Sequence, residues 1–420
     1  MIINGRIEMA KHKLYDEKVK RMADVGAGRI PDRVPICGLM ETYALAYSGT
    51  LLKDAATSIK ANVHGHAKIY KDIYYDCAYV PTLAHAWEVS DVLGSDVYFI
   101  SGDGFTEQHK EYAPMVDEDY AALAADPIRF ILDEFAPRKF TAFDGTNEEQ
   151  RKAFLSSLLP FMKFAGALIY GNIVFKNQDT PIVVGGAAEM PLDFLFDYLR
   201  GFRPTIGDLR RHGDEVKAAT EALLDYSIDL THMTNLMMGG MSGGLPWMLK
   251  NGVNAIVLRN DFEFTPFPWI FNPCHIPPFI SPKQFEEFYW PGYKAVAEHI
   301  HAHGGHLLTV LEGEWGREKL EILTQLPDHC VTLVVENDDP KFVKDTVFNQ
   351  SIMAGLPLEL LRNGTRDECI DAAKQMVDEL APGGRFIFCT GNKVLLSPAD
   401  AKPENIRAVN EFVHGYGLYY

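Results

Sequence analysis

The C-terminal part of the chain alternates short apolar runs with longer stretches of helical pattern. Four runs of β-prone residues each stop at a polar residue or a glycine: LLTVLEG at Glu312, TLVVEND at Glu336, SIMAGLP at Gly355 and RFIFCTG at Cys389. Such runs, without polar alternation, are typical of strands buried on both faces of a parallel sheet. Chemistry in these folds gathers at the carboxyl ends of the strands. Glu312, Glu336 and Cys389 are therefore the first candidates for an active site.

The rest of the chain continues the same alternation. The segments IPDRVPICGLM, DCAYVPTLAH, DVYFISGDG, TPIVVGGAAEMP and VNAIVLRND predict further strands, and helical patterns follow nearly all of them. Roughly eight strands is the number that closes a parallel barrel. We therefore expect an α/β fold, a single (β/α)8 barrel of the TIM type with long loops at its C-terminal mouth. Residues 1–30 would form an N-terminal helical extension, and residues 31–420 the barrel.

Polar residues also follow the earlier predicted strands. Glu41 comes directly after the first, His85 ends the second, and Glu189 stands just beyond the glycines of TPIVVGG. VNAIVLRND ends on Asn260 and Asp261. By the same strand-end argument, we expect Glu41 and His85 to take part in catalysis and Glu189, Asn260 and Asp261 to contact a substrate.

A segment rich in aromatic residues and proline, residues 262–282, has neither a helical nor an alternating period. It reads FEFTPFPWIFNPCHIPPFISP and predicts a long loop, which in a compact domain is usually a lid or a binding wall. Its aromatic rings would wall an apolar ligand, so Trp269 and His275 are candidate substrate contacts. A plug or a dimer contact is the alternative. The histidines of HIHAHGGH, by contrast, fall before a strand, which places them at the opposite end of a barrel.

Charge and composition exclude several classes of function. The net charge of −17 and the pI near 5.3 argue against binding to nucleic acid or to an anionic membrane surface. We identify no signal peptide, no apolar run close to the ~20 residues of a spanning helix, and no glycine-rich nucleotide-binding loop. The six cysteines are widely spaced without a CxxC pair, as in reduced cytosolic proteins. We expect a cytoplasmic enzyme; a homodimer remains open.

Several segments resemble the uroporphyrinogen decarboxylase superfamily. They are PDRVPI, WEVSDVLG, SPKQFEEFYWPGYKAVAEHIHAHGG and the C-terminal GGRFIF…NKVLLSPADAKPENIRAVNEFVHGYG. The resemblance spans nearly the whole chain and implies a (β/α)8 barrel with its site at the C-terminal mouth. The superfamily contains the decarboxylase of haem biosynthesis and a set of cobalamin-dependent methyltransferases.

The chain departs from the decarboxylase where that enzyme grips its substrate. Where the decarboxylase carries an arginine-rich segment for substrate carboxylates, this chain has GLMETYALAYSG, with Glu41 and no arginine. His85 stands near the place of the aspartate that cradles the pyrrole NH groups. Because buried carboxylates need cationic partners, an acid in place of the guanidinium groups disfavours porphyrinogen decarboxylation.

The methyltransferase branch carries a zinc site that is altered here. Val310 stands at the position of its histidine and Glu312 at that of its first cysteine, while Cys389 lies close to the place of the third ligand. Zinc also accepts carboxylate and imidazole ligands, so Glu312, Glu336 and Cys389 could form a substitute site, joined by His85 or His275. An oxygen-rich site would suit an ether or phenol methyl donor better than a thiol.

The resemblance and its departures together predict a corrinoid-dependent methyltransferase. It would move a methyl group from a small methylated compound, with an O-methyl compound favoured, to the cobalt of a partner corrinoid protein. No DxHxxG-type cobalt-ligand motif is present, so the cobalamin would come from that partner. The alternatives are a lyase that decarboxylates a carboxylated substrate and a non-catalytic tetrapyrrole- or corrinoid-binding protein.

Overall fold

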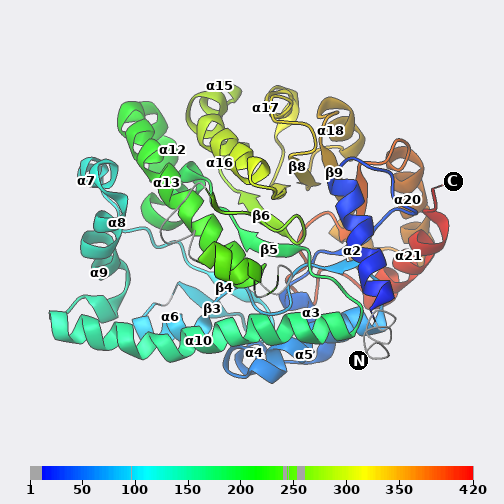
Figure 1. Ribbon diagram of the computed structural model, residues 1–420, viewed down its shortest axis with the longest axis horizontal. Helices are drawn as coiled ribbons and strands as arrows, with labels where there is room; N and C mark the ends of the chain where they lie inside the picture. Colours follow the sequence, from blue (N-terminus) through cyan, green and yellow to red (C-terminus); the bar gives the residue numbers. More distant parts are fainter. Residues whose placement is uncertain (1–11, 96, 240–243, 245, 253–260, 420) are drawn as a thin grey trace.

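An eight-stranded parallel sheet curls into a barrel at the centre of the computed structural model, which describes residues 12–95, 97–239, 244, 246–252 and 261–419 (Figure 1). Hydrogen-bonded neighbours run in the order β2-β1-β10-β9-β8-β7-β6-β5. Ala78 in β2 forms a parallel bridge with Ile182, just before β5, so the two edges meet. The expected (β/α)8 fold is thus confirmed. The strands are β1 (Ile36–Gly38), β2 (Cys77–Ala78), β5 (Val184–Ala187), β6 (Trp269–Cys274), β7 (Leu307–Leu311), β8 (Val331–Val335), β9 (Ser351–Leu356) and β10 (Phe386–Gly391).

Strand residues alternate between the barrel interior and the helices outside it. In β7, Leu308 and Val310 belong to an inner apolar cluster to which most of the barrel strands contribute, whereas Leu307 and Leu311 pack among residues of the surrounding helices. A strand covered on both faces needs apolar residues at every position, which explains the continuous runs in the sequence. Helix α2 (Lys13–Gly26) adds Met22 and Val25 to the inner cluster.

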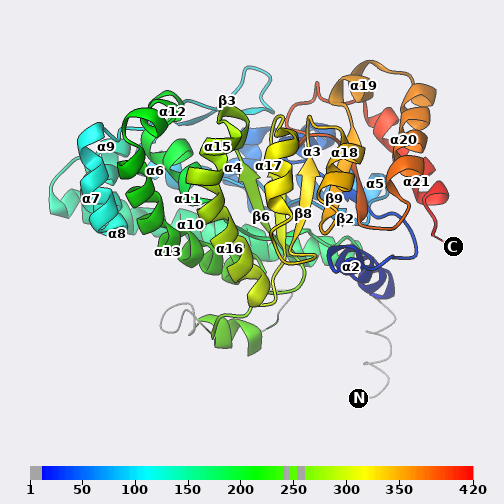
Figure 2. The same ribbon diagram turned by 90° about the horizontal axis from the view of Figure 1, so that it is seen from above.

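Helices surround the barrel, and Figure 2 shows α15 to α18 along one side of it. Helices α4, α5 and α10 lie together along one edge of the molecule in Figure 1. The bounds are α3 (Thr42–Ser48), α4 (Leu52–Thr57), α5 (Ile59–Asp72), α6 (Trp87–Leu93), α7 (Tyr120–Ala125), α8 (Pro127–Arg129), α9 (Ala136–Lys139), α10 (Asn147–Asn177), α11 (Pro191–Phe194), the π-helical turn η4 (Leu195–Arg200), α12 (Phe202–Arg211), α13 (Gly213–Met238), α15 (Pro282–Gln284), the π-helical turn η7 (Phe285–Tyr289), α16 (Trp290–Ala302), α17 (Gly316–Leu323), α18 (Pro340–Thr346), α19 (Leu358–Asn363), α20 (Arg366–Leu380) and α21 (Pro403–Tyr416).

Two strand predictions need correction. The run around Tyr98 is not a barrel strand: β3 (Tyr98–Ile100) pairs only with β4 (Glu107–His109), as a separate antiparallel hairpin. The aromatic segment expected as one loop contains barrel strand β6. The strand predicted over residues 253–261 lies almost wholly outside the described residues. The barrel therefore has eight strands, as expected, and β6 is its fourth in chain order.

Candidate active site at the strand ends

Titratable side chains follow six of the eight barrel strands. Glu41 follows β1, His85 lies beyond β2, Glu189 follows β5, and His275, Glu312 and Glu336 come directly after β6, β7 and β8. Because side chains alternate along a strand, Glu312 continues the inward-facing series of Leu308 and Val310. Glu336 continues the series of Val334 in the same way. The period of the strands therefore aims both carboxylates into the mouth of the barrel.

His275 links two carboxylates. Its Nδ1 lies 2.6 Å from Oδ2 of Asp197 in η4, and its Nε2 lies 3.0 Å from Oε1 of Glu312. Burial opposes a charge on the ring, but the bonds to Asp197 and Glu312 outweigh it and raise the pKa of His275 to about 12. The ring is therefore an imidazolium at neutral pH, with both nitrogens engaged as donors.

Two further acids lie behind this pair, and each has a pKa raised to neutral pH or above. Asp193 is fully buried and accepts hydrogen bonds from the backbone N–H groups of His275 and Ile276 and from the hydroxyl of Tyr289. Burial, followed by the negative charge of Asp197, raises the pKa of Asp193 to about 7. Burial, followed by the charges of Asp197 and Asp193, raises the pKa of Glu189 to about 8. Glu189 therefore keeps its proton at neutral pH.

One oxygen of Glu189 has no partner within the described part of the chain. Its Oε1 accepts a hydrogen bond from the Tyr198 hydroxyl at 3.3 Å, but its Oε2 is buried and makes no hydrogen bond there. An unsatisfied buried polar atom is costly, and such atoms concentrate where a ligand supplies the missing partner. Because Oε1 already accepts from Tyr198, the proton of the neutral Glu189 carboxyl group can be donated from Oε2 to a ligand.

Glu336 occupies the next strand end. Its Oε2 accepts from the backbone N–H of Gly313 at 3.2 Å and lies 3.4 Å from Nζ of Lys393. Burial raises the pKa of Glu336, the Gly313 and Lys393 contacts oppose the shift, and the charge of Glu312 adds to it. Gly313 adopts φ +66°, and a Cβ there would approach Pro278 to 2.9 Å, so the turn that presents its N–H requires glycine.

The β3–β4 hairpin closes the other side of the mouth. His85 Nδ1 lies 2.5 Å from Oε1 of Glu107 in β4, and its ring stacks on Tyr98 in β3 at 4.0 Å between centroids. Burial opposes a charge on His85, but Glu107 raises its pKa. Glu41 accepts from the backbone N–H of Ala84 at 2.9 Å, and burial raises its pKa. Glu41 and His85 thus lie together, as expected from their strand-end positions.

Tyrosine rings join the two sides into one site. Burial and the charges of Glu107, Asp197, Glu189 and Glu41 raise the pKa of Tyr98 to about 12, so acids from both sides of the mouth act on its hydroxyl. Burial and the charges of Glu41 and Glu312 likewise raise the pKa of Tyr79. The Tyr79 ring meets Phe271 of β6 edge to face at 5.2 Å. The mouth therefore combines acids with an aromatic wall.

Glu312, Glu336 and Cys389, the zinc ligands expected from the sequence, are not gathered into one ligand set in the structure. Among the described residues, Asp117, Asp208 and His212 are the one set of three or more whose ligand atoms lie within 4.8 Å of one another, and arginines already pair with those two aspartates. Cys389 is fully buried, donates to the Gly391 carbonyl at 3.1 Å, and burial raises the pKa of its thiol well above the usual range. The thiol is therefore protonated as it stands, and zinc would have to displace that proton to bind it.

Three other sequence candidates are not placed at the mouth. Trp269 opens β6 and so lies at the opposite end of the barrel, 1% exposed, with its ring 4.6 Å from that of His306. This corrects its expected role as a pocket wall. Asp261 is exposed and precedes Phe262, whose ring stacks on His232. Asn260 lies outside the described residues.

The histidines of residues 299–306 lie where the sequence placed them, at the end of α16 and before β7. His306 is held by the His329 carbonyl and the Thr332 hydroxyl, and burial lowers its pKa to about 3. A neutral ring with both nitrogens in hydrogen bonds has a structural role at the bottom of the barrel.

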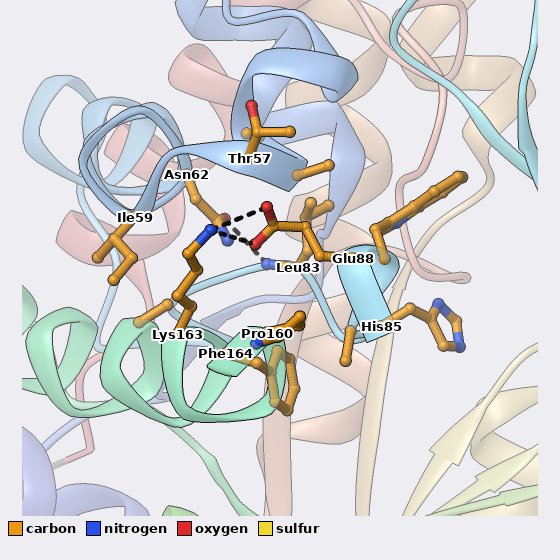
Figure 3. Close-up of a pocket in the computed structure, with 14 residues that line it drawn as sticks. Thr57, Ile59, Asn62, Leu83, His85, Glu88, Pro160, Lys163 and Phe164 are labelled. Atoms are coloured by element: carbon orange, nitrogen blue, oxygen red, sulfur yellow. Dashed lines mark hydrogen bonds and ion pairs between the residues drawn. The ribbon is translucent and has the colours of Figure 1, made fainter. Parts of the chain in front are cut away.

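A small pocket adjoins the site behind His85 (Figure 3). Lys163 of α10 reaches across it to both oxygens of Glu88, at 3.0 and 3.1 Å, while His85 points away from that pair. Its volume of about 40 Å³ holds only a few water molecules. This pocket is therefore too small for a substrate. It lies where α10 packs beside α4, α5 and α6.

Sequence reasoning missed Asp193, Asp197, Tyr98, Glu107 and Lys393. One signal was available: Glu189, Asp193 and Asp197 recur every four residues directly after a strand end, which puts Asp193 and Asp197 on one face of the following helix, with Glu189 just before its first turn. Tyr98 and Glu107 come from a hairpin inserted between barrel strands, and no local pattern indicates where such an insertion folds back.

Known proteins resemble this chain in sequence and in fold. The family model described as uroporphyrinogen decarboxylase (URO-D) matches residues 269–416. A methyltransferase from Methanosarcina mazei has a similar structure, with a TM-score of 0.61 and 13% sequence identity over 95% of this chain and 98% of that one. No curated protein matches the sequence. The resemblance seen in the sequence is thus confirmed: residues 269–416 match the uroporphyrinogen decarboxylase family model, and the chain has the same fold as that methyltransferase.

Proposed function

We propose that the chain is a corrinoid-dependent methyltransferase that removes a methyl group from a small O-methyl compound. The observation that carries the proposal is the buried Oε2 of Glu189 at the mouth of the barrel, which makes no hydrogen bond within the described part of the chain, on a carboxyl group whose pKa burial raises to about 8. An ether oxygen is a poor leaving group unless it gains a proton as its bond to carbon breaks. Glu189, whose pKa is about 8, holds that proton at neutral pH.

The remaining residues would position the substrate and exclude water. Tyr79, Tyr98 and Phe271 offer an apolar, aromatic surface suited to the ring of a phenyl methyl ether. The His275 imidazolium fixes Glu312 and Asp197, so Glu312 fits an orienting role rather than the acid role expected from sequence. The corrinoid of a partner protein would supply the nucleophilic cobalt that receives the methyl group. The fold shared with a methyltransferase supports this assignment.

A carboxy-lyase is less well supported by the charges. The described residues of the mouth include seven acids and, as cationic groups, only His85, His275 and Lys393. The acids are Glu41, Glu107, Glu189, Asp193, Asp197, Glu312 and Glu336. Such a surface repels a substrate rich in carboxylates, since each buried carboxylate needs a cationic partner.

The test is a methyl-transfer assay with purified protein, free cob(I)alamin and a series of methoxylated phenols, followed by the absorbance of methylcobalamin. We expect transfer that falls as pH rises through about 8, and a loss on the order of 10²-fold in Glu189→Gln. Glu318→Gln, an exposed acid in α17, is the matched control and should keep the rate.

Release of carbon dioxide from a carboxylated substrate, without methyl transfer, would instead identify a lyase. Binding of a corrinoid or tetrapyrrole with no turnover of any substrate would identify a binding protein. Either result overturns the proposal, as does full activity in Glu189→Gln.

A further inference from the structure

One face of α10 is apolar and exposed. We call it the apolar stripe, and its members are each between 41% and 68% exposed: Phe154, Leu155, Leu158, Leu159, Phe161, Met162, Ile169 and Ile173. At about 100° per residue these side chains fall within an arc of about 160°. The same arc contains Ala165, Gly166 and Asn172, but no charged residue between positions 153 and 173. The stripe is therefore a continuous apolar surface.

The opposite side of α10 packs against the protein. Pro160, Lys163, Phe164 and Ala167 line the small pocket against α4, α5 and α6, on the side of α10 away from the stripe (Figure 3). Within the described part of the chain, α10 is the one helix long and apolar enough to span a bilayer, contrary to the expectation that no segment would be. Only 22% of its most apolar stretch is buried in the structure. A helix that is apolar all round implies a second partner.

The stripe is larger than the apolar patches of ordinary monomers. From the exposed fractions it presents roughly 800 Å², whereas the largest patch on a monomer is typically about 300–600 Å². Stable protein–protein interfaces bury about 800 Å² on each partner. The area thus matches what a dimer needs without a contribution from any other element.

The spacing of the stripe is that of a helix–helix seam. Leu155, Met162 and Ile169 repeat every seven residues, and Leu158 and Ala165 repeat beside them at the same interval. A seven-residue apolar repeat keeps a seam facing a second helix along its length. The small residues Ala165 and Gly166 allow a second helix to approach closely near the middle of α10.

The charges at the ends of α10 indicate how the second helix runs. Glu148 lies in the first turn of α10 and Lys176 in the last. In an antiparallel pair with Met162 on the two-fold axis, Glu148 faces Lys176 of the partner subunit at both ends. We propose that the apolar stripe is the interface of a homodimer in which α10 packs antiparallel against α10 of a second copy. A closed two-fold pair of this kind is the commonest oligomer.

A lipid surface fits the stripe less well than a second copy. Helices that lie on membranes carry lysine and arginine beside their apolar face, and the net charge of −17 is repelled by anionic lipid. Lys163, beside the stripe, is paired with Glu88, and Arg151 and Lys152 are matched by Glu148 and Glu149 in the first turns of α10, so no net positive charge flanks the stripe.

The experiment is the mass of the full chain in solution, measured by light scattering after gel filtration at micromolar concentration. We expect twice the 47.1 kDa of one chain for wild type and a shift to the monomer in Leu159→Glu, with an unchanged circular dichroism spectrum. Ser156→Glu adds the same charge to an exposed position of α10 outside the stripe, and this variant should remain dimeric.

Cysteine substitutions test the antiparallel arrangement without adding charge. All six native cysteines are buried, so a new thiol on the stripe is the exposed one. Met162→Cys should form a disulfide-linked dimer on mild oxidation, whereas Ile173→Cys, far from the axis, should not. Crosslinking of both in equal yield would overturn the antiparallel arrangement. A monomeric wild type, or flotation with anionic or neutral vesicles that Leu159→Glu abolishes, would overturn the dimer.

Discussion

Nε2 of His275 lies 3.0 Å from Oε1 of Glu312, and Nδ1 of the same ring lies 2.6 Å from Oδ2 of Asp197. One imidazolium therefore joins the ends of β6 and β7 to the helical turn that follows α11. Because Asp197 is, after burial, the largest cause of the raised pKa values of Glu189 and Asp193, this contact links the charge of His275 to those two acids.

Replacing His275 by Gln should reduce methyl transfer on the order of 10²-fold and lower the melting temperature. A neutral amide keeps hydrogen bonds but cannot balance two carboxylates, so Glu312 and Asp197 would repel one another. Steady-state kinetics and a thermal unfolding curve measure both effects.

His301→Gln, at the bottom of the barrel, is the matched control and should change neither quantity. Glu312→Gln removes one of the two carboxylates and should also lose activity on the order of 10²-fold while the fold is kept. Equal rates in Glu312→Gln and wild type would remove the His275–Glu312 pair from the site.

The contribution of Asp193 and Glu189 to the stability of the protein should fall as pH rises from about 4 to about 8. The folded-state pKa values of Asp193 and Glu189 are about 7 and about 8, well above those of free carboxyl groups, so these two groups bind more protons in the folded chain than in the unfolded chain in this range. Their contribution is present below about pH 4 and is lost as pH rises through 7 to 8. Each group would contribute on the order of 1 kcal/mol per pH unit. Burial lowers the pKa of His306 to about 3 and acts in the opposite direction, so the effect of the acids is measured as a difference between variants.

Urea unfolding at several pH values measures this dependence. Glu189→Gln removes one titrating group, so its unfolding free energy should fall less with pH than that of wild type, by on the order of 1 kcal/mol per pH unit. Glu318→Gln, in an exposed helix turn, should leave the slope as in wild type. Equal slopes in all three proteins would contradict the raised pKa of Glu189.

Cys389 should be dispensable for catalysis. Its thiol is protonated and buried in the inner cluster, so Cys389→Ala should keep the methyl-transfer rate within about twofold while costing on the order of 1 kcal/mol of stability. A metal chelator should likewise leave the rate unchanged. If either treatment abolished turnover and metal analysis found zinc only in the active protein, the zinc site expected from sequence would be restored.

The barrel was largely predictable from the sequence, because strands buried on both faces require continuous apolar runs. β7 to β10 satisfy that condition fully, and all four were predicted. β6 was not, because Pro273 lies within it and proline normally argues against a central strand. The apolar run at Tyr98 was predicted as a barrel strand but is not one. Its strand, β3, is only partly buried and pairs with β4 in a separate hairpin.

The candidate site was less predictable, because it depends on contacts between distant segments. Strand ends indicated Glu312, Glu336 and Glu189, and the aromatic segment indicated His275. The raised pKa of Glu189, however, depends on burial and on Asp197 and Asp193, which belong to a helix. Glu107 reaches His85 through a hairpin. The pKa of a group depends on burial and on its neighbours, and neither is a property of the local sequence.

The sequence interpretation and the structure predict different effects of replacing Trp269. As a wall of the mouth, it would contact an aromatic methyl donor, and Trp269→Ala would raise KM with little effect on the melting temperature. The structure instead places it at the first position of β6, 1% exposed, against His306 and the last turn of α2, where a Cβ on Gly26 would come within 2.8 Å of its ring.

Trp269→Ala should therefore leave a cavity at the bottom of the barrel, since few neighbours can collapse into the space of an indole. We expect a loss of about 3–5 kcal/mol of unfolding free energy with an unchanged KM in the protein that remains folded. Trp269→Phe keeps most of the volume and should lose less stability. Urea unfolding and steady-state kinetics at low temperature measure the two quantities. A tenfold rise of KM with an unchanged unfolding midpoint would return Trp269 to the mouth of the barrel.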